Sequence, residues 1–181
     1  MKEIEIKAKL REKEKIIQKL QSLGCVFELA ITQEDVVYTE RVGSLEALRS
    51  NKFFLRLRVK NNSKVLFTIK KRMANDLDAI EHEVEVSSKT EMEQAILLMG
   101  FKEAVKVNKV RIVTHYDGCE ICIDEVENLG TFIEMEKLAE EGDSEAIQEK
   151  LFHFFESIGI NRDDRVLMGY DLLMVQSGEV N

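Results

Sequence analysis

The sequence of 181 residues predicts an α+β domain built on one large antiparallel sheet. About eight segments alternate between polar and apolar residues with the two-residue period of a strand, and few helical segments lie between them. Parallel neighbours would each require a crossover connection, so the strands are expected to run antiparallel. The helical segments carry an apolar stripe, which the apolar face of the sheet can cover.

The expected strands pair charged residues on one face with apolar residues on the other. The first strand places Glu3, Glu5 and Lys7 together, with Ile4 and Ile6 opposite. Two later strands are joined by the hairpin turn Asp117-Gly118. The strands are predicted over 2–10, 33–40, 53–60, 64–71, 81–86, 103–116, 119–127 and 131–138.

The expected helices show apolar residues at helical spacing and recognisable ends. Gly24 and Gly100 offer C-terminal stops, and Asp143 or Ser144 can cap the helix that follows. The helices are predicted over 12–23, 89–99, 145–158 and 163–176, with a short helical turn in the loop 43–51. We expect a single domain over 1–176 and a C-terminal tail over 177–181.

The charged face of the sheet is built largely from Glu, Arg and Lys, with acids and bases on separate strands. It carries Arg56, Arg58 and Lys60; Glu81, Glu83 and Glu85; Lys109 and Arg111; Asp124; and Glu134 and Glu136. Two arrangements are compatible with this pattern. An open sheet would expose the charged face to water, whereas a curled sheet would line a lumen with it and keep the helices outside.

The amino-acid composition limits the classes of molecule that the protein is expected to bind. The net charge of −8 argues against a general nucleic-acid-binding protein, whereas local clusters of basic residues suit a small anion. Lys71, Arg72 and Lys106 are interpreted as surface residues. No apolar run approaches membrane-spanning length and no signal-peptide core is visible, so we expect no membrane partner and a cytoplasmic location.

Five segments occur in the order seen in a known family. They are Glu3-x-Glu5-x-Lys7, Leu55-Arg56-Leu57-Arg58, Thr68-Ile69-Lys70, Lys109-Val110-Arg111 and the run from Asp124 to Glu136. This pattern resembles the CYTH domains, named after class IV (CyaB-type) adenylyl cyclases and thiamine triphosphatases, among the triphosphate tunnel metalloenzymes. The resemblance extends to Tyr170-Asp171-Leu172-Leu173, although Gly169 stands where a serine is common.

The resemblance implies a closed eight-stranded antiparallel tunnel with a charged lumen and helices outside, which grips a triphosphate with Mg²⁺ or Mn²⁺. It implies metal binding by Glu3, Glu5, Glu134 and Glu136. It implies triphosphate binding by Lys7, Arg56, Arg58, Lys70, Lys109 and Arg111. It implies catalytic roles for Lys7, Glu83 and Asp124.

Three functions share such a tunnel. We favour an enzyme of the class IV cyclase kind, which converts ATP to cyclic AMP and pyrophosphate. The alternatives are a triphosphatase, acting on tripolyphosphate, thiamine triphosphate or a nucleotide, and a non-catalytic triphosphate sensor. The sequence leaves open a homodimer and the role of the last helix, where Arg165 is expected on the surface and Tyr170 either packs or contacts the tunnel end.

Overall fold

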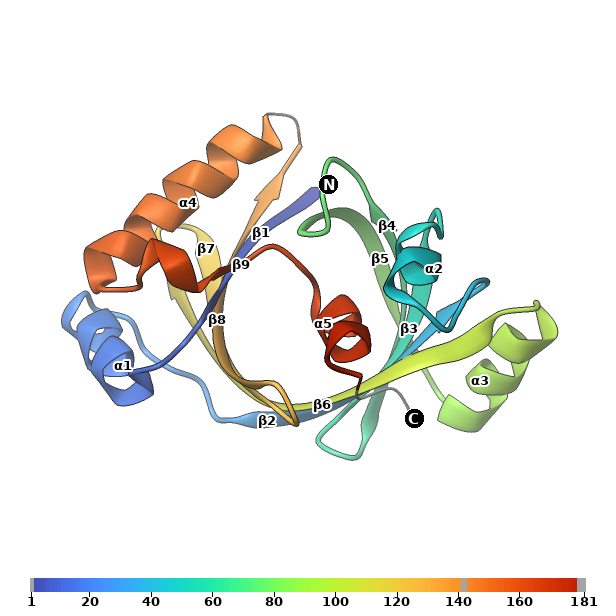
Figure 1. Cartoon of the computed structure of the whole chain (residues 1–181). Coiled ribbons are helices and arrows are strands. Elements are labelled where there is room, and N and C mark those ends of the chain that lie inside the picture. Colours follow the sequence, from blue (N-terminus) through green and yellow to red (C-terminus); the bar gives the residue numbers. More distant parts are fainter. Residues whose placement is uncertain (1, 141–142, 179–181) are drawn as a thin grey trace.

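The computed structural model describes residues 2–140 and 143–178. Its strands follow the order β5-β4-β3-β2-β6-β7-β8-β1, and β1 pairs with β5 to close the ring. Every pairing is antiparallel, and Figure 1 looks through the ring. The predicted α+β fold with a closed eight-stranded antiparallel sheet and outer helices is therefore confirmed.

The strands have the following bounds: β1 (Lys2–Lys9), β2 (Ile31–Thr39), β3 (Phe54–Lys60), β4 (Lys64–Arg72), β5 (Asp78–Val86), β6 (Lys102–Tyr116), β7 (Cys119–Val126), β8 (Gly130–Ala139) and the short β9 (Arg165–Val166). The fifth strand begins three residues earlier than predicted. That extension matters, because Asp78, Ala79 and Ile80 are the residues that pair with β1 and close the ring.

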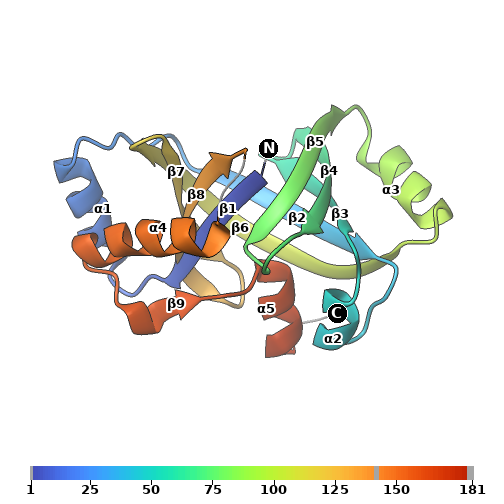
Figure 2. The ribbon, with the colours of Figure 1, turned by 90° about the horizontal axis from the view of Figure 1, so that it is seen from above.

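The helices are α1 (Lys13–Ser22), α2 (Leu45–Arg49), α3 (Lys89–Leu98), α4 (Ser144–Ile158) and α5 (Tyr170–Ser177), with a 3₁₀ turn η1 (Arg162–Asp164). Figure 2 shows α1 and α4 on one side of the ring, α3 on the other, and α5 at one end. No helix among the described residues is long and apolar enough to cross a membrane.

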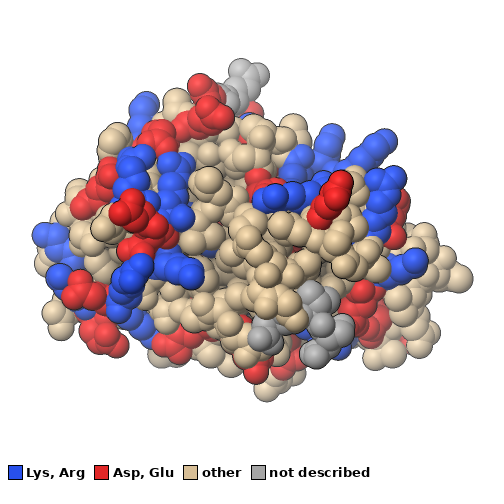
Figure 3. Space-filling view, in the orientation of Figure 1, with Lys and Arg blue, Asp and Glu red and all other residues tan. Residues whose placement is uncertain are grey.

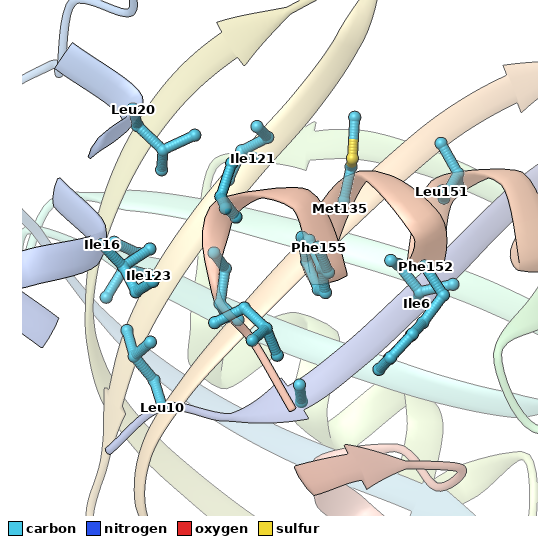
Figure 4. Close-up of a cluster of buried hydrophobic side chains, with 14 of the residues drawn as sticks. Ile6, Leu10, Ile16, Leu20, Ile121, Ile123, Met135, Leu151, Phe152 and Phe155 are labelled. Atoms are coloured by element: carbon cyan, nitrogen blue, oxygen red, sulfur yellow. The ribbon is translucent and has the colours of Figure 1, made fainter. Parts of the chain in front are cut away.

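The largest core lies between the outer face of the ring and helices α1 and α4. Ile6 of β1, Ile121 of β7 and Met135 of β8 face Leu20 of α1 and Phe155 of α4, and all five are at most 3% exposed. Figure 4 shows these side chains converging between the helices and the sheet. Burying this apolar stripe fixes which face of each strand points outward, so the alternate residues must point into the ring.

The predicted helix over 163–176 is wrong in its first half. Arg165 has extended backbone angles, and β9 pairs with Lys7 and Ala8 of β1 before α5 begins after Gly169. Pairing to the free side of β1 therefore outweighs the weak helical preference of this segment. The division into one domain and a tail stays a prediction, and residues 179–181 of that tail lie outside the described residues.

Candidate active site

A cavity of about 410 Å³ lies inside the ring. Because many outward positions pack against the helices, the alternate, charged positions of the strands face this space. All of the predicted site residues except Asp124 line it, namely Glu3, Glu5, Lys7, Arg56, Arg58, Lys70, Glu83, Lys109, Arg111, Glu134 and Glu136. Asp124 is fully buried beneath them and reaches the cavity only through its partners.

One end of the cavity is covered by α5 and is largely apolar, apart from the pair of Arg72 with Asp171 of that helix. Val37, Phe54 and Val107 occupy inward positions there and pack with Tyr170 and Met174 of the helix. In Figure 1, α5 lies across the opening of the ring, and the space-filling view in Figure 3 shows mostly uncharged atoms over the same place. The charged groups are thus reached from the other end.

A group that we call the paired end surrounds Asp124. Its carboxylate accepts hydrogen bonds from Arg111 at 2.7 and 2.5 Å, from Lys109 at 3.2 Å and from the Tyr170 hydroxyl at 3.0 Å. Glu134 contacts Arg111 and lies 3.0 Å from the Lys7 ammonium. Burial alone would raise the pKa of Glu134, but the charges of Lys7 and Arg111 outweigh it and hold the pKa well below its usual range.

The paired end also changes the pKa of one of its own basic residues, Lys109. Burial and the neighbouring Arg111 lower the pKa of Lys109 to about 8, in spite of Asp124. The Lys7 and Lys109 ammoniums lie 3.9 and 4.8 Å from the centre of the Tyr170 ring, within cation–π range. Tyr170 therefore does both things that the sequence left open, since it packs in the apolar cluster and also contacts the charged groups. Arg165 instead pairs with Glu149 of α4, outside the ring.

A second group, the acidic end, consists of Glu3, Glu5, Glu120 and Glu136. Glu136 lies directly opposite Glu5 on one neighbouring strand and Glu120 on the other. Burial, together with the charges of Glu3 and Glu5, raises the pKa of Glu136 to about 8. Burial likewise raises the pKa values of Glu3 and Glu5.

The acidic end has the donor chemistry of a divalent metal site. One oxygen of Glu5 is buried and accepts no hydrogen bond, although the Lys7 ammonium lies 3.1 Å away outside bonding geometry. Carboxylate oxygens are the ligands that Mg²⁺ and Mn²⁺ prefer. Among the described residues, no group of three or more His, Cys, Asp or Glu side chains is placed so that it could hold a metal ion by itself. A cation at the acidic end would therefore need water or substrate oxygens as ligands beside the carboxylates.

On the opposite wall, each predicted phosphate-binding base has an acidic partner. Arg58 donates to Asp35 at 2.7 and 2.6 Å, and Arg56 lies 2.7 Å from Glu81. Lys70 lies 2.8 Å from Glu81 and 3.0 Å from Glu3. Glu83 approaches Arg56 at 3.3 Å and accepts a hydrogen bond from Thr68 at 3.0 Å. An incoming polyanion would compete with these carboxylates.

Two residues of this wall were missed or misplaced by the sequence analysis. Asp35, 6% exposed, was not recognised, although it alternates with Gln33 and Val37 on the inward face of β2. Arg72 was wrongly expected on the surface. It shares the parity of Lys70, lines the cavity and pairs with Asp171 of α5. Residues two apart on a strand share a face, so the inward position of Arg72 follows from that of Lys70.

Comparisons with known proteins agree with this architecture. The CYTH domain family matches residues 1–170. A Methanocaldococcus jannaschii protein named "Putative adenylate cyclase" is 28% identical over 171 residues, covering 93% of this chain and 95% of its own length. The structure of a Pyrococcus horikoshii protein superposes with a TM-score of 0.81 at 27% identity, over 97% of this chain and 99% of that one.

A more distant structure shares the fold at 21% identity. It is a Hippeastrum protein described as a putative adenylyl cyclase that reveals a dominant triphosphatase activity. The TM-score is 0.63, and the match covers 98% of this chain and 96% of the Hippeastrum chain.

Proposed function

The chain belongs to the CYTH domain family, and we propose that it is a metal-dependent enzyme acting on a triphosphate substrate. The observation that carries this proposal is the cavity itself, in which bases on one wall and carboxylates at the acidic end face the same space. A triphosphate and a divalent cation together match both sets of charges.

The proposed triphosphate-binding residues are Lys7, Arg56, Arg58, Lys70, Lys109 and Arg111. Arginine holds phosphate oxygens through two parallel hydrogen bonds, and lysine adds a compact positive charge. Each of these bases lies beside an acid that holds it in place. Phosphate oxygens would replace those carboxylates as partners.

The proposed metal-binding residues are Glu3, Glu5, Glu134 and Glu136. When bound, Mg²⁺ or Mn²⁺ supplies positive charge that stabilises a triphosphate and the group that leaves it. The carboxylates are held close together by the register of β1 and β8, and burial keeps water from screening them. Glu134 differs from its neighbours because Lys7 and Arg111 already compensate its charge.

Lys7, Glu83 and Asp124 are the proposed catalytic residues. Lys7 is 2% exposed and lies between the acidic end and the paired end, where it can stabilise negative charge that develops on a phosphoryl oxygen. Asp124 orients Arg111 and Lys109 by accepting their hydrogen bonds. Glu83 fixes Arg56 and lies at the more open part of the cavity.

We favour a class IV cyclase activity on ATP. In that reaction the 3′-oxygen bonds to the α-phosphorus and the bond from that phosphorus to the pyrophosphate breaks. The name of the Methanocaldococcus jannaschii relative supports this choice. A triphosphatase is the second candidate, and the Hippeastrum protein indicates that the fold accommodates hydrolysis. A non-catalytic sensor is disfavoured because both metal-type carboxylates and bases line the cavity.

The products of turnover separate these candidates. The protein is incubated with ATP or tripolyphosphate and with Mg²⁺ or Mn²⁺, and the products are resolved by chromatography. Cyclic AMP with pyrophosphate is the expected result. Orthophosphate would identify the triphosphatase, and binding without product would identify the sensor. Glu136→Gln should abolish turnover while the fold persists, and an unchanged rate at saturating metal would remove Glu136 from the metal site.

A further inference from the structure

We propose that Gln33 and Lys60 form an additional anion-binding subsite, which holds the phosphoryl group nearest the open end of the cavity. The proposal rests on the proposed function and adds to it a reason why three phosphoryl groups are recognised. Neither residue belongs to the set taken from the family pattern. Both line the cavity, on the adjacent strands β2 and β3.

Lys60 is the first observation. It is the last residue of β3, directly before the turn Asn61–Ser63, and it is half-buried. The other bases that line the cavity each have a carboxylate within 4.0 Å, whereas Lys60 has none among the described residues. It is therefore the one lining cation in this part of the chain whose charge no side chain balances at close range.

The surroundings of Lys60 strengthen its need for an anion. Burial and the charge of Arg58 lower its pKa, with smaller contributions of the same sign from Arg56 and Arg111. Glu83 is the acid that opposes them, at a distance beyond ion pairing. Bound phosphate would face several positive charges here, and it would displace no carboxylate from Lys60.

Gln33 is the second and independent observation. Its side chain is 2% exposed, and its Oε1 is buried without a hydrogen bond. In the sheet Gln33 lies opposite Lys60 on one side and Lys109 on the other. The amide oxygen is an acceptor and cannot pair with a phosphate oxygen, so Gln33 contributes to the subsite only through its amide N–H groups, which can donate to one. The two ends of the amide are interchangeable by half a turn of the side chain, which lets these donors face the ligand.

The position of the subsite suggests that it responds to chain length. Lys7 and Lys109 are 2% and 7% exposed and lie beside the end that α5 covers, whereas Lys60 lies at the end of its strand and is more exposed. Gln33 lies between Lys109 and Lys60, so a polyphosphate anchored at the deep residues passes Gln33 and reaches Lys60 only with its outermost group. The subsite should thus contribute to binding of tripolyphosphate and hardly to binding of pyrophosphate.

Calorimetric titration of the full chain with tripolyphosphate and with pyrophosphate, both in Mg²⁺, tests this inference. Lys60→Met should raise the Kd for tripolyphosphate roughly 10- to 100-fold, the range for hydrogen bonds to charged groups, and the Kd for pyrophosphate less than about threefold. Lys71→Met is the matched control, because Lys71 is exposed on the outer face of β4, and its Kd values should not change. Gln33→Leu should weaken tripolyphosphate binding by a smaller factor in the same direction.

The outcomes are distinguishable. An unchanged Kd for tripolyphosphate in Lys60→Met would overturn the subsite while leaving the proposed function intact. Equal losses for both probes would overturn the dependence on length and place Lys60 in the deep part of the site. A wild-type chain that binds neither probe would refute the proposed function, and the subsite with it.

Discussion

Glu134 and Glu136 lie two residues apart on β8 and line the same cavity, yet their protonation is driven in opposite directions. Lys7 and Arg111 outweigh burial and hold the pKa of Glu134 well below its usual range. Burial, with Glu3 and Glu5 as neighbours, raises the pKa of Glu136 to about 8. Two side chains on the same face of a strand can therefore have different electrostatic environments. Which charges surround each one depends on the register of the strand with its two neighbours.

This contrast separates the paired end from the acidic end in function as well. The paired end satisfies its own charges, so it can act as a fixed scaffold of oriented hydrogen-bond donors. The acidic end leaves carboxylates close together, and a cation relieves their repulsion. Substitutions in the two regions should therefore change the stability of the metal-free protein with opposite signs.

Removing Asp124 should have the largest effect. Asp124→Ala leaves Arg111 and Lys109 buried without their main partner, and breaking such a pair costs about 3–5 kcal/mol. The free energy of unfolding, measured in urea, should fall by that amount. Glu125→Ala is the control, since Glu125 is an exposed acid on the same strand. A loss below about 1 kcal/mol for Asp124→Ala would mean that the paired end is not a scaffold.

Neutralising Glu136 should instead stabilise the metal-free protein. Because its pKa rises from 4.5 to about 8 on folding, the folded chain binds this proton more tightly, and stability falls as pH increases between those values. Glu136→Gln removes that loss, so at pH 7 the variant should be more stable than the wild type by about 3 kcal/mol, at about 1.4 kcal/mol for each pH unit above 4.5. Thermal unfolding in EDTA at pH 5, 7 and 9 measures it. Parallel pH profiles for the two proteins would contradict the account.

Tyr170→Phe should have a smaller effect. The substitution removes the hydrogen bond to Asp124 and keeps the ring beside Lys7, so we expect a loss of about 1 kcal/mol in unfolding free energy. Tyr116→Phe provides the comparison, because that ring stacks on Phe154 outside the cavity. If both variants lose the same stability, the Tyr170 hydroxyl makes no specific contribution to the paired end.

Glu120→Gln should have the smallest effect. Glu120 raises the pKa of Glu136 as the last of several contributions, and its side chain is 41% exposed. We expect a gain in stability below about 0.5 kcal/mol and a small decrease in the pKa of Glu136, visible as a shifted midpoint of the pH–stability curve. An effect as large as that of Glu136→Gln would show that Glu120 belongs to the centre of the acidic end.

The sequence was sufficient for much of the fold because alternation is a local property. Arg56 with Arg58 and Glu134 with Glu136 share a face whatever the rest of the chain does, and the turns at Asn61 and Asp117 adopt the positive φ values that their residue types favour. Closure of the ring, in contrast, depends on contacts between residues far apart in the sequence. The pattern left it open, the family resemblance supplied it, and the structure attributes it to the pairing of β1 with β5.

The partners of the site residues were the part that could not be predicted. Asp35 pairs with Arg58 through the register of β2 and β3, and Tyr170 reaches Asp124 from a helix that starts after Gly169. Neither contact follows from parity, because each depends on how distant segments align. The last helix was mispredicted for the same reason, since β9 pairs with β1 across more than 150 residues of chain.

The central claim is that a polyphosphate and a divalent cation together balance the charges of this cavity. Calorimetric titration of the wild-type chain with tripolyphosphate at pH 7.5, once with Mg²⁺ and once with EDTA, tests it most directly. We expect at least about tenfold tighter binding with Mg²⁺, equivalent to about 1.4 kcal/mol. Equal affinity under the two conditions, or no binding with Mg²⁺, would contradict the claim.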